Sequence, residues 1–309
     1  MELIRELDGI DPRFKGGVLS VGVFDGVHVG HQRVLGRAVE RARSLGAPAI
    51  VFTFHPHPLA VLRPQEAPPR IQTFGRKLDL MRESGIAAVI WPHDSAAILA
   101  MPPREFFEKV ICDALAARAI VEGGDFRFGA GAGGDRRMLE SLARERGIEV
   151  EFVGEMLVGG DRVSSTRIRR LIAAGSVAEA ARCLGRPYRY QGTVVEGHHR
   201  GARLGYPTIN VESPRFLAPA EGVYAGWAEV RGGRCLAAIS VGRAPTFRGP
   251  NEIVVEAFLL DFEGELYGEQ VALDFLEYLR SQQAFADAEA LKRQMAADCE
   301  RVRAIAGNM

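Results

Sequence analysis

One stretch near the N-terminus, VGVFDGVHVGHQ at residues 21–32, constrains the fold more than any other. The apolar, β-rich run from Gly17 to Phe24 predicts a strand, Asp25-Gly26 predicts a turn, and apolar residues then recur at helical spacing. The order strand, glycine-rich loop, helix is typical of a crossover in a parallel sheet. The pattern therefore places His28 and His31 at the start of a helix.

A helix start with two histidines predicts an anion site. Backbone N–H groups there lack intrahelical partners and carry partial positive charge, so phosphate is the expected ligand. Two imidazoles three residues apart can donate to its oxygens. A lone histidine is more often an ordinary surface or core-edge residue, but HVGH matches the HxGH pattern of adenylyl- and cytidylyl-transferring enzymes. Zinc is a weaker alternative, because no nearby Cys or HExxH completes a ligand set.

The composition argues against several other classes of protein. The length of 309 residues suggests two domains, and 39 Lys and Arg balance 39 Asp and Glu, so no net charge favours nucleic acid or an anionic membrane. The N-terminal segment carries acids where a signal sequence would be apolar, and no apolar run reaches the roughly 18 residues of a membrane span. We expect a cytoplasmic protein with no nucleic-acid or membrane partner, and the sequence leaves homo-oligomerisation open.

The four cysteines do not form a recognisable metal or redox motif. Cys112, Cys183, Cys235 and Cys299 lie far apart and make no CxxC pair, which argues against a zinc ribbon or a thioredoxin-like centre. We expect buried, reduced thiols.

Strand and helix patterns alternate from residue 17 to about residue 160. Strand-like runs begin near Val18, Pro48, Ala87, Arg118 and Ile148, and helical patterns lie around residues 33–44, 76–84, 104–116 and 136–146. Such alternation predicts an α/β domain, a doubly wound parallel sheet with ligands beyond the carboxyl ends of its strands.

Two loops are predicted at those ends. FHPHP at residues 54–58 follows the second strand, and its prolines would hold His55 or His57 at the sheet edge. GGDFRFGAGAGGD at residues 123–135 follows the fourth strand, and its glycines let backbone approach a nucleotide. An ordinary surface loop explains either stretch when it is read alone. The second loop also contains a GxGxxG spacing, but DFRF separates it from its strand, so NAD binding is disfavoured.

The segment VSSTRIRRLIAAGSVAEAARCLG, from residue 163, combines hydroxyls with guanidinium groups at a helix start. Ser165 and Thr166 can cap one helix, and Ser176 with Glu179 predicts a capping box for the next. Capping explains the hydroxyls without any function. Arginines 167, 169 and 170 follow directly, however, and the combination is suited to polyphosphate.

The pattern changes after Pro187, where short strands separated by Gly-rich turns predict a small antiparallel β-barrel. A terminal helix follows, whose apolar stripe should pack on the barrel: Leu291, Met295, Cys299, Val302 and Ile305. We therefore expect two domains, residues 1–186 and 187–309.

The most informative segment of the second domain is GHHRGARLGYPTINV, residues 197–211. Thr208 and Asn210 offer neutral oxygen ligands that suit Mg²⁺ bound to nucleotide phosphates, although a turn explains PTIN equally well. Glu256 lies in the apolar strand VVEAFLLDF, where a buried carboxylate needs a role or a partner. A solvated glutamate on an edge strand is the alternative.

Four N-terminal motifs, VGVFDGVHVGHQ, FHPHP, GGDFRFG and SSTRIRRLI, occur in an order that resembles the adenylyltransferase module of bacterial bifunctional riboflavin kinase/FAD synthetases. The resemblance covers most of residues 15–185. The C-terminal segment GARLGYPTIN is similar to the GRxxGxPTxN part of the riboflavin kinase signature, and GVYAGW, SVGRAPTF and LRSQQAF follow in that family's order.

The resemblance implies an enzyme that phosphorylates riboflavin to FMN with ATP and Mg²⁺, then adenylylates FMN to FAD with a second ATP. It implies catalytic roles for Glu256, His28 and His31, and Mg²⁺ ligands at Thr208 and Asn210. It implies nucleotide or phosphate contacts at Gly22, Phe24, Gly30, Ser165, Thr166, Arg169 and Gly205. It implies flavin contacts at His57, Asp125 and Arg280.

Three positions depart from the family pattern: Ala132 and Ala202 stand where arginine-containing sequences are usual, and Gln282 stands where an acid is common. Substrate contacts at these positions cannot be carried over. Two alternatives to a bifunctional enzyme stay open, an enzyme with only one live activity and a non-catalytic flavin or nucleotide sensor.

Overall fold

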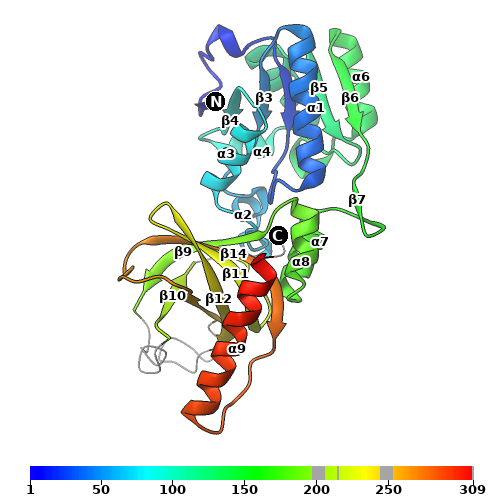
Figure 1. The fold of residues 1–309 in the computed structure, drawn as a ribbon. Helices are drawn as coiled ribbons and strands as arrows, with labels where there is room; N and C mark the ends of the chain where they lie inside the picture. The colour runs from blue at the N-terminus through cyan, green and yellow to red at the C-terminus, as the bar shows by residue number, and fades with distance from the viewer. Residues whose placement is uncertain (197–205, 214–215, 244–252, 308–309) are drawn as a thin grey trace. The chain divides into compact units, whose positions relative to one another are not determined.

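The computed structural model describes residues 1–196, 206–213, 216–243 and 253–307 (Figure 1). The chain divides into two compact units. The first consists of Met1–Pro68 and Thr73–Val163, and the second of Pro69–Gln72 and Ser164–Met309.

The first unit is built on a six-stranded sheet in the order β1-β4-β3-β2-β5-β6, and every neighbouring pair is parallel. The strands are β1 (Glu2–Ile4), β2 (Val18–Val21), β3 (Ala49–Phe52), β4 (Ala88–Ile90), β5 (Ala119–Gly123) and β6 (Glu149–Val153). The predicted parallel sheet is confirmed. Strand β1 was not predicted, because three residues that pair only with β4 leave no periodic signal.

Helices cover both faces of this sheet. The α-helices are α1 (Val29–Leu45), α2 (Pro58–Leu62), α3 (Phe74–Glu83), α4 (Ser95–Ala100), α5 (Pro103–Phe106) and α6 (Arg136–Arg146), and α5 continues as a π-helix over Phe107–Ala114. Short 3₁₀ turns occupy Pro12–Phe14, Pro64–Glu66 and Ala130–Ala132, and β7 (Leu157–Val158) pairs with β8 (Asp161–Arg162). Buried residues of α1 and α3 pack with Val18, Val51 and Val89 of the sheet. Those of α5, the π-helix and α6 pack with Leu19, Ile50 and Ile120, so the sheet is doubly wound as predicted.

The second unit contains a closed antiparallel barrel in the order β10-β13-β12-β11-β14-β9. Its strands are β9 (Tyr188–Val195), β10 (Thr208–Glu212), β11 (Gly222–Val230), β12 (Gly233–Arg243), β13 (Ile253–Leu259) and β14 (Gln270–Arg280). Helix α9 (Ala288–Gly307) packs Cys299, Val302 and Ile305 against the barrel's outer face. The predicted barrel and terminal helix are confirmed.

Helices α7 (Ser165–Ala173) and α8 (Val177–Leu184) belong to the same compact unit as the barrel. Helix α8 contacts β9 and β14, and the left-handed Gly175 between the helices lies where a Cβ would come 2.9 Å from the Tyr224 hydroxyl. The structural division therefore falls between Val163 and Ser164, earlier in the chain than the expected functional boundary at Pro187.

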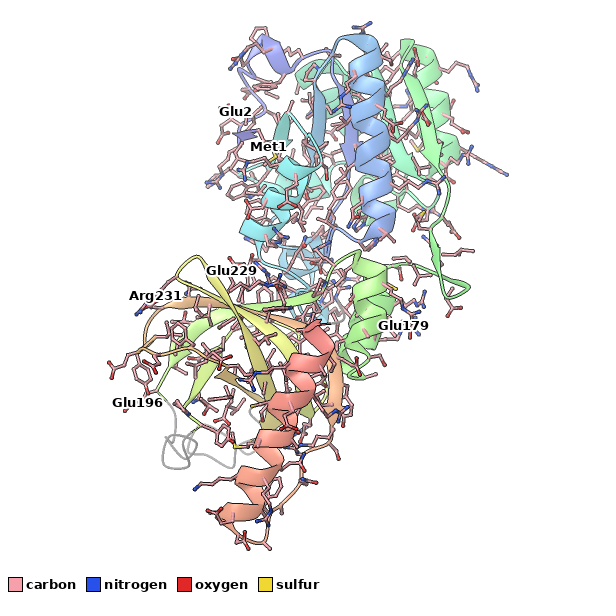
Figure 2. All side chains as sticks on the ribbon, viewed as in Figure 1. Met1, Glu2, Glu179, Glu196, Glu229 and Arg231 are labelled. Atoms are coloured by element: carbon pink, nitrogen blue, oxygen red, sulfur yellow. The ribbon has the colours of Figure 1, made fainter. Side chains whose placement is uncertain are left out.

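The predicted caps of these two helices are corrected. Ser164, one residue before the predicted hydroxyls, caps α7 by accepting a hydrogen bond from the Arg167 N–H at 3.2 Å. Ser176 makes no side-chain cap on α8. Glu179 (Figure 2) instead accepts a hydrogen bond from Arg167 at 2.6 Å, because the buried guanidinium is the stronger partner.

A fragment of residues 164–309 should unfold at a higher temperature than one of residues 187–309. The shorter fragment loses α7 and α8. Helix α8 alone buries Val177, Ala180, Cys183 and Leu184, and burial of one Val or Leu contributes about 1.5–3 kcal/mol. Thermal unfolding followed by circular dichroism compares the two. Equal midpoints would show that this pair of helices does not stabilise the barrel.

Candidate functional site

The loop from β2 to α1 shapes the predicted phosphate site. His28 is the N-cap of α1, and its Nδ1 accepts a hydrogen bond from the His31 N–H at 3.3 Å. The two imidazoles stack with ring centroids 3.6 Å apart, and the edge of Phe24 meets His31 at 5.2 Å. The structure therefore brings the two predicted catalytic histidines together at a helix start, as the HVGH spacing predicts.

The cap also fixes the chemistry of the His28 ring. Because Nδ1 accepts a hydrogen bond, the ring proton of neutral His28 lies on Nε2, which makes that nitrogen a donor of the kind a phosphate oxygen requires. Gly30 permits this geometry, since a Cβ there would come within 3.2 Å of the His28 ring. At Gly22 a Cβ would lie 3.0 Å from Phe24. A side chain at either of these two glycines, both predicted as nucleotide contacts, would be in tight contact with its neighbour in the loop.

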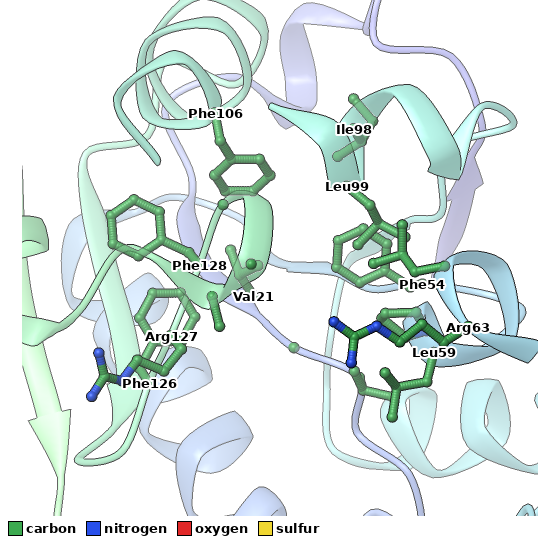
Figure 3. Close-up of a pocket in the computed structure, with 17 residues that line it drawn as sticks. Val21, Phe54, Leu59, Arg63, Ile98, Leu99, Phe106, Phe126, Arg127 and Phe128 are labelled. Atoms are coloured by element: carbon green, nitrogen blue, oxygen red, sulfur yellow. The ribbon is translucent and has the colours of Figure 1, made fainter. Parts of the chain in front are cut away.

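A cavity of about 490 Å³ lies beside this loop, within the first unit (Figure 3). Its walls are mostly apolar and come from β2, the FHPHP loop, α4, α5 and the loop after β5. The lining includes Val21, Gly22, Val23, Phe54, Pro58, Leu59, Ile98, Leu99, Phe106, Phe126, Phe128, Gly129 and Ala132. Phe126 and Phe128 stack at 5.6 Å and 8°, so the cavity offers flat aromatic faces to a planar ligand.

Arg63 and Arg127 also line this cavity, and Figure 3 shows both guanidinium groups beside the apolar side chains. Val21, Gly22 and Val23 lead directly into the loop that carries His28. The apolar cavity and the histidine pair therefore share one strand end, where a planar group and a phosphate of one ligand can both be held.

Two predicted flavin residues make other contacts. Nδ1 of His57 accepts a hydrogen bond from the Leu59 N–H at 3.2 Å and caps α2, and the neighbouring Pro58 and Leu59 line the cavity. Asp125 forms an exposed ion pair with Arg162, while Phe126 beside it lines the cavity. Flavin contacts by His57 and Asp125 stay predictions.

The predicted phosphate residues of α7 lie in the second unit. Ser165 is the first residue of α7, Thr166 is exposed, and the Arg169 Nε donates to the Pro69 carbonyl at 2.8 Å. Their part in binding the same phosphates as His28 and His31 stays a prediction.

The second unit has a cavity of about 210 Å³ between the barrel's outer face and α9, lined by Thr208, Ser240, Glu256, Phe258, Arg280, Gln282 and Asp298 among others. In the β10–β13 ladder, Asn210 lies opposite Glu256 and Thr208 opposite Phe258. Alternate residues of a strand share a face, so Thr208, Asn210 and Glu256 lie on one side of two paired strands. Pairing thus gathers the predicted Mg²⁺ ligands and the predicted base.

The neighbours of this oxygen cluster are held by α9 and β12. Arg280 uses Nε and Nη2 on Asp298, at 3.1 and 2.7 Å, and Nη1 on the Ser281 carbonyl. Gln282 donates to the Ser240 hydroxyl at 2.9 Å and to the Val241 carbonyl. Arg280 lines the cavity with its guanidinium bound to α9, so its flavin contact stays a prediction. The predicted Gly205 and the departure at Ala202 lie outside the described residues.

An oxygen cluster of this composition fits Mg²⁺. Thr208 supplies a hydroxyl and Asn210 an amide oxygen, which are ligands that hard cations accept, and the carboxylate-bearing Glu256 lies opposite Asn210. Within the described residues, no group of three or more His, Cys, Asp and Glu is arranged to hold a metal. Mostly neutral ligands leave charge to be supplied by nucleotide phosphates, which suits a metal that arrives with ATP.

The cysteines behave as structural thiols. All four are free, with Cys183 and Cys299 buried and Cys112 and Cys235 half-buried. Burial raises the pKa of each thiol above its ordinary value, which keeps it protonated near neutral pH.

Among the helices that the structure describes, none is both long and apolar enough to cross a bilayer.

Several residues of the apolar cavity were missed by sequence analysis. Ile98, Leu99 and Phe106 come from α4 and α5. They lie at the cavity only because these helices pack on the sheet, which no local sequence pattern indicates. Phe126 and Phe128 stand inside a motif that the sequence singles out, where alternate phenylalanines before a glycine run were the available signal.

Comparison with known proteins assigns both units. Residues 11–167 match the FAD synthetase family model, and residues 184–306 match the riboflavin kinase model. The bifunctional riboflavin kinase/FMN adenylyltransferase of Pseudomonas fluorescens is 35% identical over 99% of this chain and 98% of its own length. That of Escherichia coli K12 is 33% identical over 96% of each chain.

A solved structure described as a macrolide-efflux protein from Streptococcus pneumoniae superimposes with a TM-score of 0.87 and 32% identity, over 97% of this chain and 98% of that one. The overall fold is therefore shared along nearly the whole length of both chains. With both family models matched and relatives aligned end to end, this chain belongs to the family of bifunctional riboflavin kinase/FMN adenylyltransferases, which convert riboflavin to FMN and FMN to FAD.

Proposed function

We propose that residues 1–186 carry the adenylyl transfer and residues 187–309 the riboflavin phosphorylation. The observation that supports this division is that each part has its own cavity beside its own phosphate-type donors or metal-type ligands. Each ATP reaction then uses a separate constellation of residues.

In adenylyl transfer, the isoalloxazine ring of FMN lies in the 490 Å³ cavity against Phe126 and Phe128, and Arg127 offers positive charge to the flavin phosphate. An FMN phosphate oxygen attacks the α-phosphorus of ATP in line, the bond to the β-phosphate oxygen breaks, and pyrophosphate leaves. His28 and His31 donate hydrogen bonds to the phosphates and stabilise the leaving charge, together with Ser165, Thr166 and Arg169 of α7.

In riboflavin phosphorylation, the flavin enters the cavity beside α9, and Glu256 accepts the proton of the ribityl 5′-hydroxyl as that oxygen attacks the γ-phosphorus of ATP. ADP is the leaving group. Thr208 and Asn210 would hold Mg²⁺, which neutralises charge on the phosphates when bound.

Replacing either histidine should remove FAD synthesis selectively. His28→Ala or His31→Ala should lower FAD formation from FMN by about 10²–10³-fold, because each removes a donor to charge that develops on the phosphates. Riboflavin phosphorylation should stay near the parent rate. Chromatographic separation of the flavins measures both reactions in one sample, and undiminished FAD synthesis would remove the histidines from the mechanism.

Glu256→Gln should have the reverse effect, abolishing FMN formation while supplied FMN is still converted to FAD. Gln is nearly isosteric with Glu and keeps a hydrogen bond but cannot accept the hydroxyl proton at neutral pH. The matched control is Glu229→Gln on strand β11 of the same barrel, whose carboxylate is exposed and pairs with Arg189. Phosphorylation at the parent rate by the Glu256 variant would place the base elsewhere.

The aromatic wall of the first cavity should control FMN affinity. Phe126→Ala removes one of the two stacked rings proposed to contact the isoalloxazine, and an aromatic contact is worth about 0.5–1.5 kcal/mol beyond its buried area. The KM for FMN in FAD synthesis should therefore rise several-fold, with a smaller change in kcat and none in the KM for riboflavin in phosphorylation. A KM for FMN equal to the parent value would show that the flavin binds outside this cavity.

A further inference from the structure

A buried lysine lies beneath both loops of the adenylyl-transfer site. Lys77 is in the second turn of α3, on the face that buries Leu78, Leu80 and Met81. The residue is only 6% exposed, which is rare for a lysine. A buried ammonium is costly unless its donors are satisfied, so the partners of Lys77 indicate what the charge is used for.

The three N–H groups of Lys77 have three acceptors. Nζ lies 2.9 Å from the Val23 carbonyl, 3.3 Å from the Thr53 hydroxyl and 3.3 Å from the Phe54 carbonyl. The Thr53 hydroxyl donates in turn to the Val23 carbonyl at 3.3 Å. A single buried charge thus joins the segment after β2 to the segment after β3.

Each of these two segments leads directly into the site. Val23 lies between Gly22, which lines the flavin cavity, and Phe24, which meets His31. Phe54 lines the same cavity and precedes His55, whose ring stacks on Phe74 of α3. The loop after β2 is also strained, with φ of +50° at Phe24 and +36° at Val27, so it needs external contacts to keep its shape.

We propose that Lys77 is a positioning residue for adenylyl transfer, whose ammonium holds the histidine loop and the flavin loop in register so that FMN and ATP meet in line. Lys77 acts through the main chain of these loops and not by contact with the phosphates. Loss of the charge leaves a neutral amine with two N–H groups for three acceptors, and the remaining bonds are weaker because they are no longer charge-assisted.

The charge of Lys77 should disappear in an accessible pH range. Burial lowers the pKa of Lys77 from its ordinary 10.5 to about 8, while nearby Asp25 opposes the shift. The other titratable groups on these segments are Asp25, His28, His31, His55 and His57. Above about pH 8 we therefore expect FAD synthesis to fall while riboflavin phosphorylation does not follow it.

The sign of the stability change separates this effect from unfolding. Between about pH 8 and pH 10.5 the unfolded chain holds the Lys77 proton more tightly than the folded one, so this group makes the folded state relatively more stable as pH rises. Activity and the Lys77 contribution to stability should thus change in opposite directions, which a purely structural lysine would not produce.

The test measures kcat for FAD formation from supplied FMN and Mg²⁺-ATP between pH 7 and pH 10, with riboflavin phosphorylation as the internal control. Lys77→Met should lower kcat by about 10²-fold at pH 7, the scale expected when reacting groups are misplaced by about 1 Å, and should abolish the decline above pH 8. Lys77→Arg keeps its charge and should move that decline to higher pH. Lys109→Met, at an exposed lysine paired with Glu105, is the matched control and should behave as the parent.

A measurement on the parent enzyme alone can contradict the proposal, so the test does not depend on the folding of any variant. A parent kcat for FAD formation that stays constant from pH 7 to pH 10 would contradict it. So would a folded Lys77→Met protein, with a parent-like circular dichroism spectrum, that makes FAD at the parent rate. A decline in Lys77→Arg at the same pH as in the parent would assign the titration to another group.

Discussion

The strained turn between β2 and α1 is the constraint on which the first unit depends. Val27 and Phe24 take positive φ values that L-residues rarely adopt, at a cost of order 1–3 kcal/mol each. Both side chains are buried, and burying a Val or Phe contributes about 1.5–3 kcal/mol, so packing offsets the strain. The buried apolar residues of FDGVHVGH are therefore as necessary for the site as its histidines, because their packing stabilises the turn that places His28 at the N-cap.

The barrel gathers its polar groups without comparable strain. Thr208 and Asn210 share a face because they are two residues apart on β10, and Glu256 joins them through the register of the β10–β13 pair. On the opposite face of β13, the buried side chains of Val255, Ala257 and Leu259 fill the barrel. A one-residue slip would exchange the two sets, so the core that closes the barrel also fixes the positions of these three polar side chains.

Sequence patterns predicted what depends on neighbours in the chain. The start of α1, the parallel sheet and the barrel follow from spacing and periodicity, and the structure confirms them. Features set by tertiary contacts were missed. Glu179 was predicted to form a capping box with Ser176, but Arg167 of another helix binds it. Part of the wall of the 490 Å³ cavity comes from α4 and α5, which carry no motif. Lys77 left one usable signal, a lysine three and four residues before Leu80 and Met81 on the apolar face of a helix.

Two buried ionisable side chains replace main-chain hydrogen bonds where the strands of the first unit diverge. β2 pairs with β5 only at Val18 and Leu19, and the Val21 N–H donates to the Glu122 carboxyl at 2.5 Å. β2 lies between β3 and β5. From β2 the chain continues to β3 and β4 on one side of the sheet and then to β5 on the other side, and sheets of this kind bind ligands at the point where the strand order reverses. Burial, with Asp125 nearby, raises the pKa of Glu122 well above its ordinary value and so favours the neutral carboxyl. A charged carboxylate here would repel a polyphosphate. A buried acid whose neutral form is favoured thus lies between the diverging strands, and the positive Lys77 lies beneath the neighbouring loops, an arrangement suited to an anion.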